Sequence, residues 1–63
     1  MRYTAKAEIG YRKQLMYLNE ASDGELYLAP HDAELKVFKN WEEAYAGLVL
    51  LVPLGTVVHF DAV

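Results

Sequence analysis

Apolar and polar positions repeat most clearly between Asn40 and Val52, and the repeat predicts a helix. At 100° per residue, one stripe gathers the apolar side chains of Trp41, Ala44, Tyr45, Leu48, Leu51 and Val52. Asn40 is a suitable N-cap, because its side-chain oxygen can accept a hydrogen bond from the first turn, and Glu43 can bond back to it. Pro53 disfavours helical geometry in the residue before it. We therefore expect a helix over about residues 40–51, with its apolar stripe against the core.

The beginning of the chain alternates with the period of a half-buried strand. Residues 2–9 place Thr4, Lys6 and Glu8 on one side, opposite the apolar set of Tyr3, Ala5, Ala7 and Ile9. Gly10 breaks the alternation and predicts a turn.

Residues 11–20 fit both helical and strand spacing. We favour a strand, because the turn signal at residues 21–24 and the strand-type run at residues 25–29 would complete a hairpin.

Residues 35–39 predict another short strand or an extended lead into the helix. Residues 56–63 carry valines and a phenylalanine among polar residues and predict a closing strand. Together these elements predict an α+β domain, a small and mainly antiparallel sheet of three to five strands with the helix packed on one face.

The helix pattern leaves apolar residues on a second side. Ala46, Val49 and Leu50 point away from the main stripe, and a helix that is apolar on two sides is usually buried on two sides. One explanation is that the helix ends after Gly47 and that residues 48–52 form a buried strand. The explanation we favour is a homodimer or partner surface built on Ala46, Val49 and Leu50.

Composition limits the possible folds and locations. A chain of 63 residues predicts one domain, residues 1–63, in which only about 60% of the unfolded surface can be buried. The chain contains no cysteine, so disulfides and thiolate zinc sites cannot stabilise it. The N-terminus lacks a signal-peptide pattern, and the apolar run at residues 48–54 is too short to cross a bilayer. We expect a cytoplasmic protein without membrane contacts.

The net charge of −3 is distributed unevenly. No Lys or Arg lies between Glu20 and Glu34, whereas acidic residues recur there. In so small a chain these carboxylates can gather at one end of the fold, where their summed field would attract a basic partner; a solvated rim without function is the alternative. Tyrosine is enriched where binding energy concentrates. The candidate partner-binding residues are Glu20, Asp23, Glu25, Tyr27, Asp32 and Glu34.

The first part of the chain offers a different candidate surface, because it is basic and rich in tyrosine. Stacking tyrosines beside cationic side chains are typical of proteins that bind single-stranded nucleic acid. This alternative would use Arg2, Lys6, Arg12 and Lys13 with Tyr3, Tyr11 and Tyr17. It is less favoured, because the chain is acidic overall.

Residues suited to catalysis are sparse. His59 and Asp61 share one face of the predicted last strand, and His31 and Asp32 lie in a predicted loop. Two histidines without cysteine give no framework of metal ligands. The single serine, Ser22, lies beside a turn without a base to activate it. We therefore expect no enzymatic activity, no cofactor and no bound metal.

Two segments resemble small proteins of phages and mobile elements. Residues 36–44, KVFKNWEEA, lead a short strand into a capped helix, and residues 55–58, GTVV, lead from a glycine into a last strand. The whole profile, a short acidic domain without cysteine, is similar to phage-encoded inhibitors of host machinery, anti-CRISPR proteins among them. The resemblance implies a non-enzymatic inhibitor that binds a host protein or ribonucleoprotein complex through an acidic surface.

Overall fold

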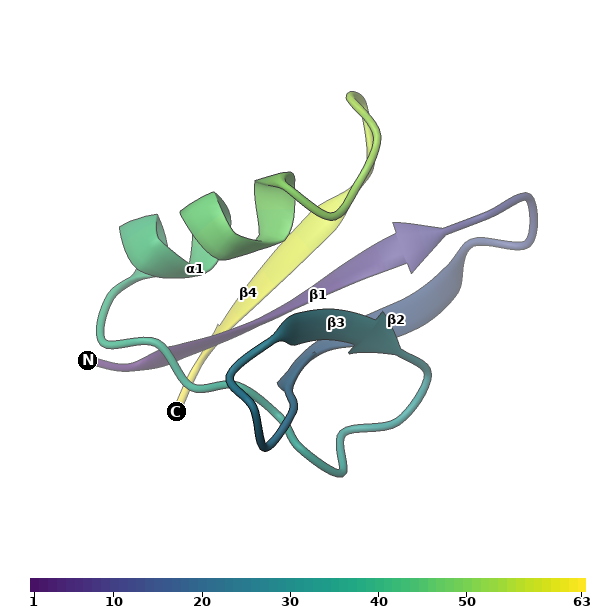
Figure 1. The fold of residues 1–63 in the computed structure, drawn as a ribbon. Helices are drawn as coiled ribbons and strands as arrows, with labels where there is room; N and C mark the ends of the chain where they lie inside the picture. The colour runs from purple at the N-terminus through teal and green to yellow at the C-terminus, as the bar shows by residue number, and fades with distance from the viewer.

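A four-stranded antiparallel sheet carries one helix on one of its faces (Figure 1). The computed structural model describes residues 1–63, and the strands lie in the order β3-β2-β1-β4. This arrangement confirms the predicted α+β class. The elements are β1 (Tyr3–Ile9), β2 (Gln14–Glu20), β3 (Leu26–Ala29), α1 (Trp41–Val49) and β4 (Val58–Ala62).

Residues 11–20 form a strand, as favoured, but the strand begins later than predicted. Residues 10–13 instead form the β1–β2 turn. A hydrogen bond of 3.1 Å from the Lys13 N–H to the Gly10 carbonyl closes this turn. Gly10 has a φ of 82° and Lys13 a φ of 57°. Glycine adopts this left-handed region freely, whereas for lysine it is a strained conformation. The turn therefore depends on Gly10.

Helix α1 begins at its predicted cap and ends two residues early. The Asn40 Oδ1 accepts a hydrogen bond from the Glu43 N–H at 2.9 Å, while the Glu43 carboxylate lies 3.9 Å from Lys39 and does not bond back to Asn40. Leu50 is the C-cap and is 84% exposed. The alternative of a buried strand over residues 48–52 is therefore wrong.

The helix packs on β1 through small side chains. Ala5 and Ala7 of β1 are buried beneath Ala44 and Leu48 of α1. Gly47 also faces the core, because a Cβ at this position would lie 3.2 Å from both Leu26 Cδ1 and Phe38 Cζ. Small contact residues allow the backbone of a helix to approach a sheet closely.

This close approach corrects part of the predicted inward stripe. Ala44 and Leu48 are buried, but Trp41 is 51% and Tyr45 48% exposed. The side of α1 that faces the sheet is formed by Ala44, Gly47 and Leu48, which leaves the rings of Trp41 and Tyr45 on the flank of the helix. The Tyr45 ring is tilted against Phe60 of β4, with 6.3 Å between the centroids.

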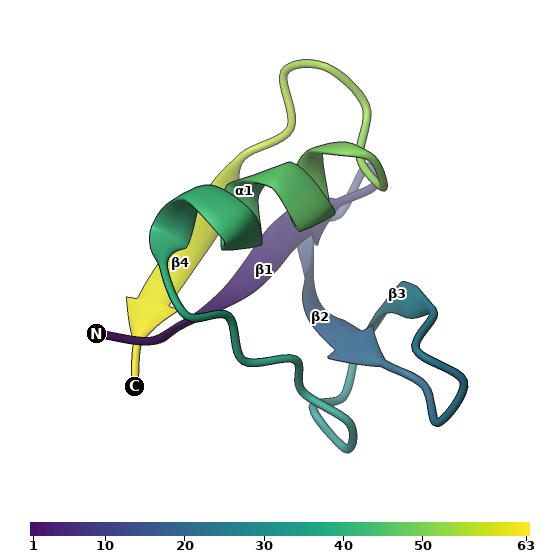
Figure 2. The same ribbon diagram turned by 60° about the vertical axis from the view of Figure 1, so that its left-hand side comes forward.

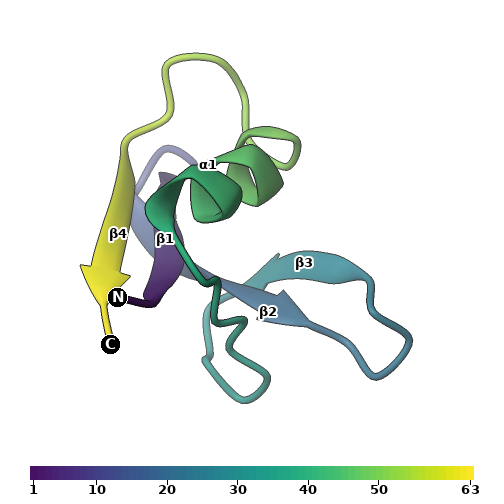
Figure 3. The ribbon, with the colours of Figure 1, turned by 90° about the vertical axis from the view of Figure 1, so that its left-hand side faces the viewer.

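The two halves of the sheet diverge, and residues 34–38 fill the gap between them. Pairing of β1 with β2 runs from Ile9↔Gln14 to Lys6↔Tyr17 and then stops. Beyond that point Phe38 exchanges two backbone hydrogen bonds with Tyr3, at 2.8 and 2.9 Å. Figure 3 shows β2 and β3 turning away from β1 and β4.

On the other side of the gap, the same segment bonds to β2. The Lys36 N–H donates to the Leu18 carbonyl at 3.0 Å, and the Glu20 N–H donates to the Glu34 carbonyl at 2.9 Å. Of the two alternatives predicted for residues 35–39, the structure shows the extended lead into the helix, with isolated bridges at Leu35 and Phe38.

Candidate functional site

The predicted acidic residues come from two connections at one end of the molecule. The β2–β3 turn and the loop at residues 30–34 both lie at the lower end of the views in Figures 1 and 2. We call this region the acidic end. It contains Asp23 and Glu25 on the turn and Asp32 and Glu34 on the loop, flanked by Glu20 at the end of β2 and by Tyr27 in β3.

A buried asparagine holds the acidic end together. Asn19, in β2, is fully buried. Its amide nitrogen donates to the carbonyls of Tyr17 at 2.8 Å and His31 at 3.0 Å, and its Oδ1 accepts from the Glu34 N–H at 2.9 Å. These three bonds use both amide hydrogens and the oxygen, so the buried polar group is satisfied. The loop at residues 30–34 is consequently attached to the sheet at both of its ends.

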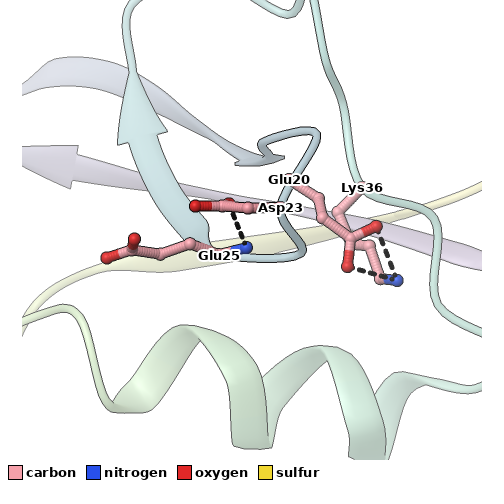
Figure 4. Close-up of polar contacts among 4 residues, drawn as sticks. All are labelled: Glu20, Asp23, Glu25 and Lys36. Atoms are coloured by element: carbon pink, nitrogen blue, oxygen red, sulfur yellow. Dashed lines mark hydrogen bonds and ion pairs between the residues drawn. The ribbon is translucent and has the colours of Figure 1, made fainter.

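Two of the carboxylates in this region have structural partners, shown in Figure 4. Glu20 binds the Lys36 ammonium through both oxygens, at 3.1 and 3.2 Å. The Asp23 Oδ1 accepts from the Glu25 N–H at 3.0 Å, an Asx-type turn in which Gly24 takes a φ of 88°. Glu20 therefore anchors the lead into the helix, and Asp23 fixes the hairpin turn.

A third carboxylate holds the tyrosine. The Tyr27 hydroxyl donates a hydrogen bond to the Glu34 Oε1. This bond raises the pKa of Tyr27 above its ordinary value of 10.0, with smaller contributions from desolvation and from the Glu34 charge. The Tyr27 ring also meets the His31 ring edge-on, with 6.5 Å between centroids. Tyr27 therefore has one fixed position on the surface.

The remaining two carboxylates, Glu25 and Asp32, are exposed and have no side-chain partner within the chain. One is on the hairpin turn and the other on the loop. The predicted set of six residues thus divides by role. Glu20, Asp23 and Glu34 build the acidic end, and Glu25 and Asp32 are free to contact another molecule beside the fixed Tyr27.

The basic residues of the alternative surface do not form one group. Arg2 precedes β1, whereas Arg12 and Lys13 follow it in the β1–β2 turn, so the length of the strand, about 20 Å, separates them. Lys6 forms an ion pair with Asp61 at 3.0 Å and lies over the Tyr17 ring. Within the turn, Tyr11 is fully exposed beside Arg12.

The sheet face opposite the helix carries the remaining candidate chemistry. His59 and Asp61 share this face, as expected, but each pairs across to β1. The His59 Nε2 lies 2.9 Å from Glu8, and Asp61 lies 3.0 Å from Lys6. No three His, Asp or Glu side chains gather in a way that suits a metal ion.

The other exposed surface is apolar and lies at the opposite end of α1 from Asn40. A pocket of about 250 Å³ opens there, between the C-terminal half of α1, the following loop and the start of β4. Residues 44–58 include no charged side chain. Of the predicted dimer residues, Ala46 is exposed, Val49 is 44% exposed and Leu50 is 84% exposed. With nine residues, α1 lacks the length for a membrane span, and the structure holds no other helix.

Sequence reasoning missed Asn19 and Lys36, the two residues that organise the acidic end. Asn19 did leave a signal, because asparagine is depleted in strands and here interrupts an apolar pattern. An asparagine inside a strand has to satisfy its amide, which indicates a nearby loop that supplies backbone partners. Lys36 left no signal of this kind, since its partner Glu20 lies 16 positions away.

No protein-family model, curated protein or solved structure matches this chain. The resemblance to phage inhibitors therefore depends only on residues 36–44 and 55–58 and on the overall profile.

Proposed function

We propose that this domain is a non-enzymatic protein-binding module that contacts a basic surface of its partner through the acidic end. The contact residues are Glu25 and Asp32, with Tyr27 as the anchor. Glu20, Asp23 and Glu34 act indirectly, because they hold the hairpin turn and the loop in place. The partner class is a host protein or ribonucleoprotein complex, and the module would inhibit it by covering a surface that otherwise binds nucleic acid.

The observation that supports this proposal is the combination of free charge and fixed backbone. Glu25 and Asp32 have no partner in the chain, yet both lie on segments that side-chain hydrogen bonds hold in place. A surface ordered in advance loses less conformational entropy when it binds. A rim that merely kept the protein in solution would not require a buried Asn19 beneath it.

The charge pattern sets the chemistry of the partner. Exposed carboxylates attract lysine and arginine side chains and speed their approach, and salt screens this attraction over about 10 Å at 0.1 M ionic strength. Tyr27 supplies apolar contact area and loses little conformational entropy on binding. A groove that binds phosphates presents the matching surface, because it gathers Lys and Arg.

The test is affinity capture with matched charge-reversal variants. The immobilised domain is incubated with lysate of the host at low and at high salt, and bound proteins are displaced with heparin as a phosphate-rich competitor. We expect one partner to be retained at low salt, and to be lost with Glu25→Lys/Asp32→Lys. The control, Glu42→Lys/Glu43→Lys, changes the charge equally on the first turn of α1, where both residues are exposed, and should retain the partner.

Three results would contradict the proposal. The first is equal capture by the wild type and the acidic-end variant, and the second is loss of capture with the helix variant alone. The third is a partner that heparin and salt leave in place. Thermal melts of each variant, followed by circular dichroism, show that a lost interaction does not reflect a lost fold.

A further inference from the structure

The outer strand β4 presents a row of unused backbone groups. Only β1 pairs with β4, and the Glu8 N–H donates to the Val57 carbonyl while the Val63 N–H donates to the Arg2 carbonyl. In an antiparallel pair these bonds alternate along the strand. The residues between them, Val58, Phe60 and Ala62, therefore direct their N–H and C=O groups away from the sheet.

The two edges of the sheet differ in how they are protected. The other edge, β3, has four residues and is followed at once by Pro30, which cannot donate a backbone hydrogen bond. β4 has five residues and contains neither proline nor lysine. Proteins usually block a free edge with such residues, because an open edge pairs with other strands. The open edge of β4 is thus a surface available for pairing.

A row of half-exposed apolar side chains lies beside this edge. Trp41, Tyr45 and Val49 follow one another at intervals of four along α1 and are 51%, 48% and 44% exposed. Tyr45 touches Phe60 of β4. Tyr45 and Val49 line the apolar pocket together with Val58. The row therefore lies on the flank of α1 that is directed toward β4.

We propose that β4 pairs antiparallel with β4 of a second copy of this chain. The two-fold axis passes at Phe60, so that two sheets join into one of eight strands. Phe60 meets Phe60 of the second copy, and Val58 meets Ala62. The rows of Trp41, Tyr45 and Val49 from the two helices approach each other above the joined strands. The interface is isologous, as a two-fold dimer requires.

Charge selects this register among those that the backbone allows. With the axis at Phe60, His59 lies opposite Asp61 of the second copy. Each already bonds to β1, His59 to Glu8 and Asp61 to Lys6, so the two pairs would join into one row in which acidic and basic side chains alternate across the interface.

The neighbouring registers lack this match. An axis at Asp61 places two aspartates opposite each other, and an axis at His59 places two histidines opposite each other. Like charges directly across a strand pair are destabilising, and opposite charges are favourable.

The sequence and size of the domain also favour a second copy. Only nine of 63 residues are buried, and domains of this size without disulfides or metals commonly gain stability from association. Each copy carries a net charge of −3, which opposes association. The acidic end lies on the β2–β3 side, across the sheet from β4, so the proposed contact keeps the two acidic ends apart.

Sedimentation of the wild type and of variants at the adjacent positions 49 and 50 tests the proposed dimer surface. The wild type should convert from monomer to dimer as its concentration rises through the micromolar range. Val49→Glu places a carboxylate in the apolar row and should raise the dimer dissociation constant roughly tenfold or more. Leu50→Glu is the matched control on the far side of the helix and should change that constant by less than about twofold.

Cysteine cross-linking tests the register in a chain that has no cysteine of its own. His59→Cys and Asp61→Cys proteins are mixed, one with a mass tag, and oxidised. Residues opposite each other at a non-hydrogen-bonded position lie about 4.5 Å apart between Cα atoms, which suits a disulfide, whereas diagonal residues are too far apart. The mixed sample should give a covalent heterodimer, and each variant alone should give little dimer.

Several outcomes would overturn the proposal. A wild type that stays monomeric at high micromolar concentration excludes the dimer. Loss of dimer with Leu50→Glu but not with Val49→Glu assigns the interface to the other side of the helix. Efficient cross-linking of either cysteine variant by itself contradicts the register. Capture of a host partner by the acidic end does not depend on any of these results, so the two proposals can fail separately.

Discussion

The helix-covered body and the acidic end are held together by different forces. In the body, Ala44 and Leu48 of α1 pack on β1 and Gly47 lies against Leu26 and Phe38, and none of the three α1 side chains carries a polar atom. In the acidic end, the turn and the loop are positioned by side-chain hydrogen bonds from Asn19 and Asp23. Dispersion and burial hold the first region, and directional polar contacts hold the second.

The two regions should therefore tolerate different substitutions. A core packed through small residues is sensitive to volume, since a missing or an added methylene leaves a cavity or a clash. A region positioned by hydrogen bonds is sensitive to the removal of single polar atoms, since the buried partners are left unpaired. Destabilising substitutions in the body should therefore cause cooperative unfolding, whereas those in the acidic end should cause local opening.

The largest effect is expected from Leu48→Ala in the body. Leu48 is 1% exposed, and truncation of a buried leucine costs about 2–5 kcal/mol, depending on how far the cavity collapses. In a domain of this size, such a loss removes most of the stability. Urea unfolding followed by circular dichroism measures it.

The control for this prediction is Leu50→Ala two residues later. Leu50 is 84% exposed, so its truncation should change the free energy of unfolding by no more than about 0.5 kcal/mol in dilute solution. Equal losses in the two variants would mean that α1 does not pack on the sheet through the Leu48 side.

An intermediate effect is expected from Asn19→Ala in the acidic end. The substitution leaves the Glu34 N–H and the His31 carbonyl without their partners, at a cost of about 2 kcal/mol. The distinguishing measurement is amide hydrogen exchange. The Glu34 amide should exchange much faster than in the wild type. The amides of α1 should exchange faster only to the extent that the global free energy of unfolding falls.

Asn40→Ala provides the matched comparison, because it removes an asparagine that accepts from a backbone N–H in the body. It should cost about 1 kcal/mol and loosen the first turn of α1, leaving the loop at residues 30–34 protected. If Asn19→Ala instead opened the helix and the loop together, the two regions would form one cooperative unit.

The smallest effect concerns the contact of Tyr27 with Glu34. The pKa of Tyr27 lies above 10.0 in the folded protein, so the folded state holds its proton more tightly than the unfolded state does. The resulting stabilisation is complete below pH 10 and is lost as the pH rises through the folded pKa. Glu34→Gln should move the ultraviolet titration of this tyrosine back toward pH 10. A titration that Glu34→Gln leaves unchanged would mean that the contact does not persist in solution.

Local patterns were sufficient to predict the elements. Alternation along residues 2–9 and the turn signal at residues 21–24 correspond to β1 and to the β2–β3 turn, and Asn40 caps α1 as predicted. These features depend on neighbours within a few positions, which a single sequence displays. The acidic residues were likewise placed at one end, because the hairpin and the loop after it follow each other in the chain.

Features that depend on distant contacts were not predictable. Trp41 and Tyr45 fit the core stripe by spacing, but the side of α1 that packs on the sheet is centred on Ala44, Gly47 and Leu48, which the spacing alone does not determine. Residues 35–39 fitted both a short strand and an extended lead into the helix, and the choice between them depends on where β1 and β2 diverge. The sequence did not show which carboxylates are structural and which are free, because the partners of Glu20 and Glu34 are visible only in the structure.

The position of β1 in the sheet has a consequence for the order in which the domain assembles. Its pairing with β2 needs only a short turn, whereas its contact with β4 joins Glu8 to His59, 51 positions later. Closing a long loop lowers the conformational entropy of the chain before stabilising contacts have formed, and contacts between residues so far apart in the sequence slow folding. We therefore expect the β1–β2–β3 meander to form first and the docking of β4 with α1 to limit the folding rate.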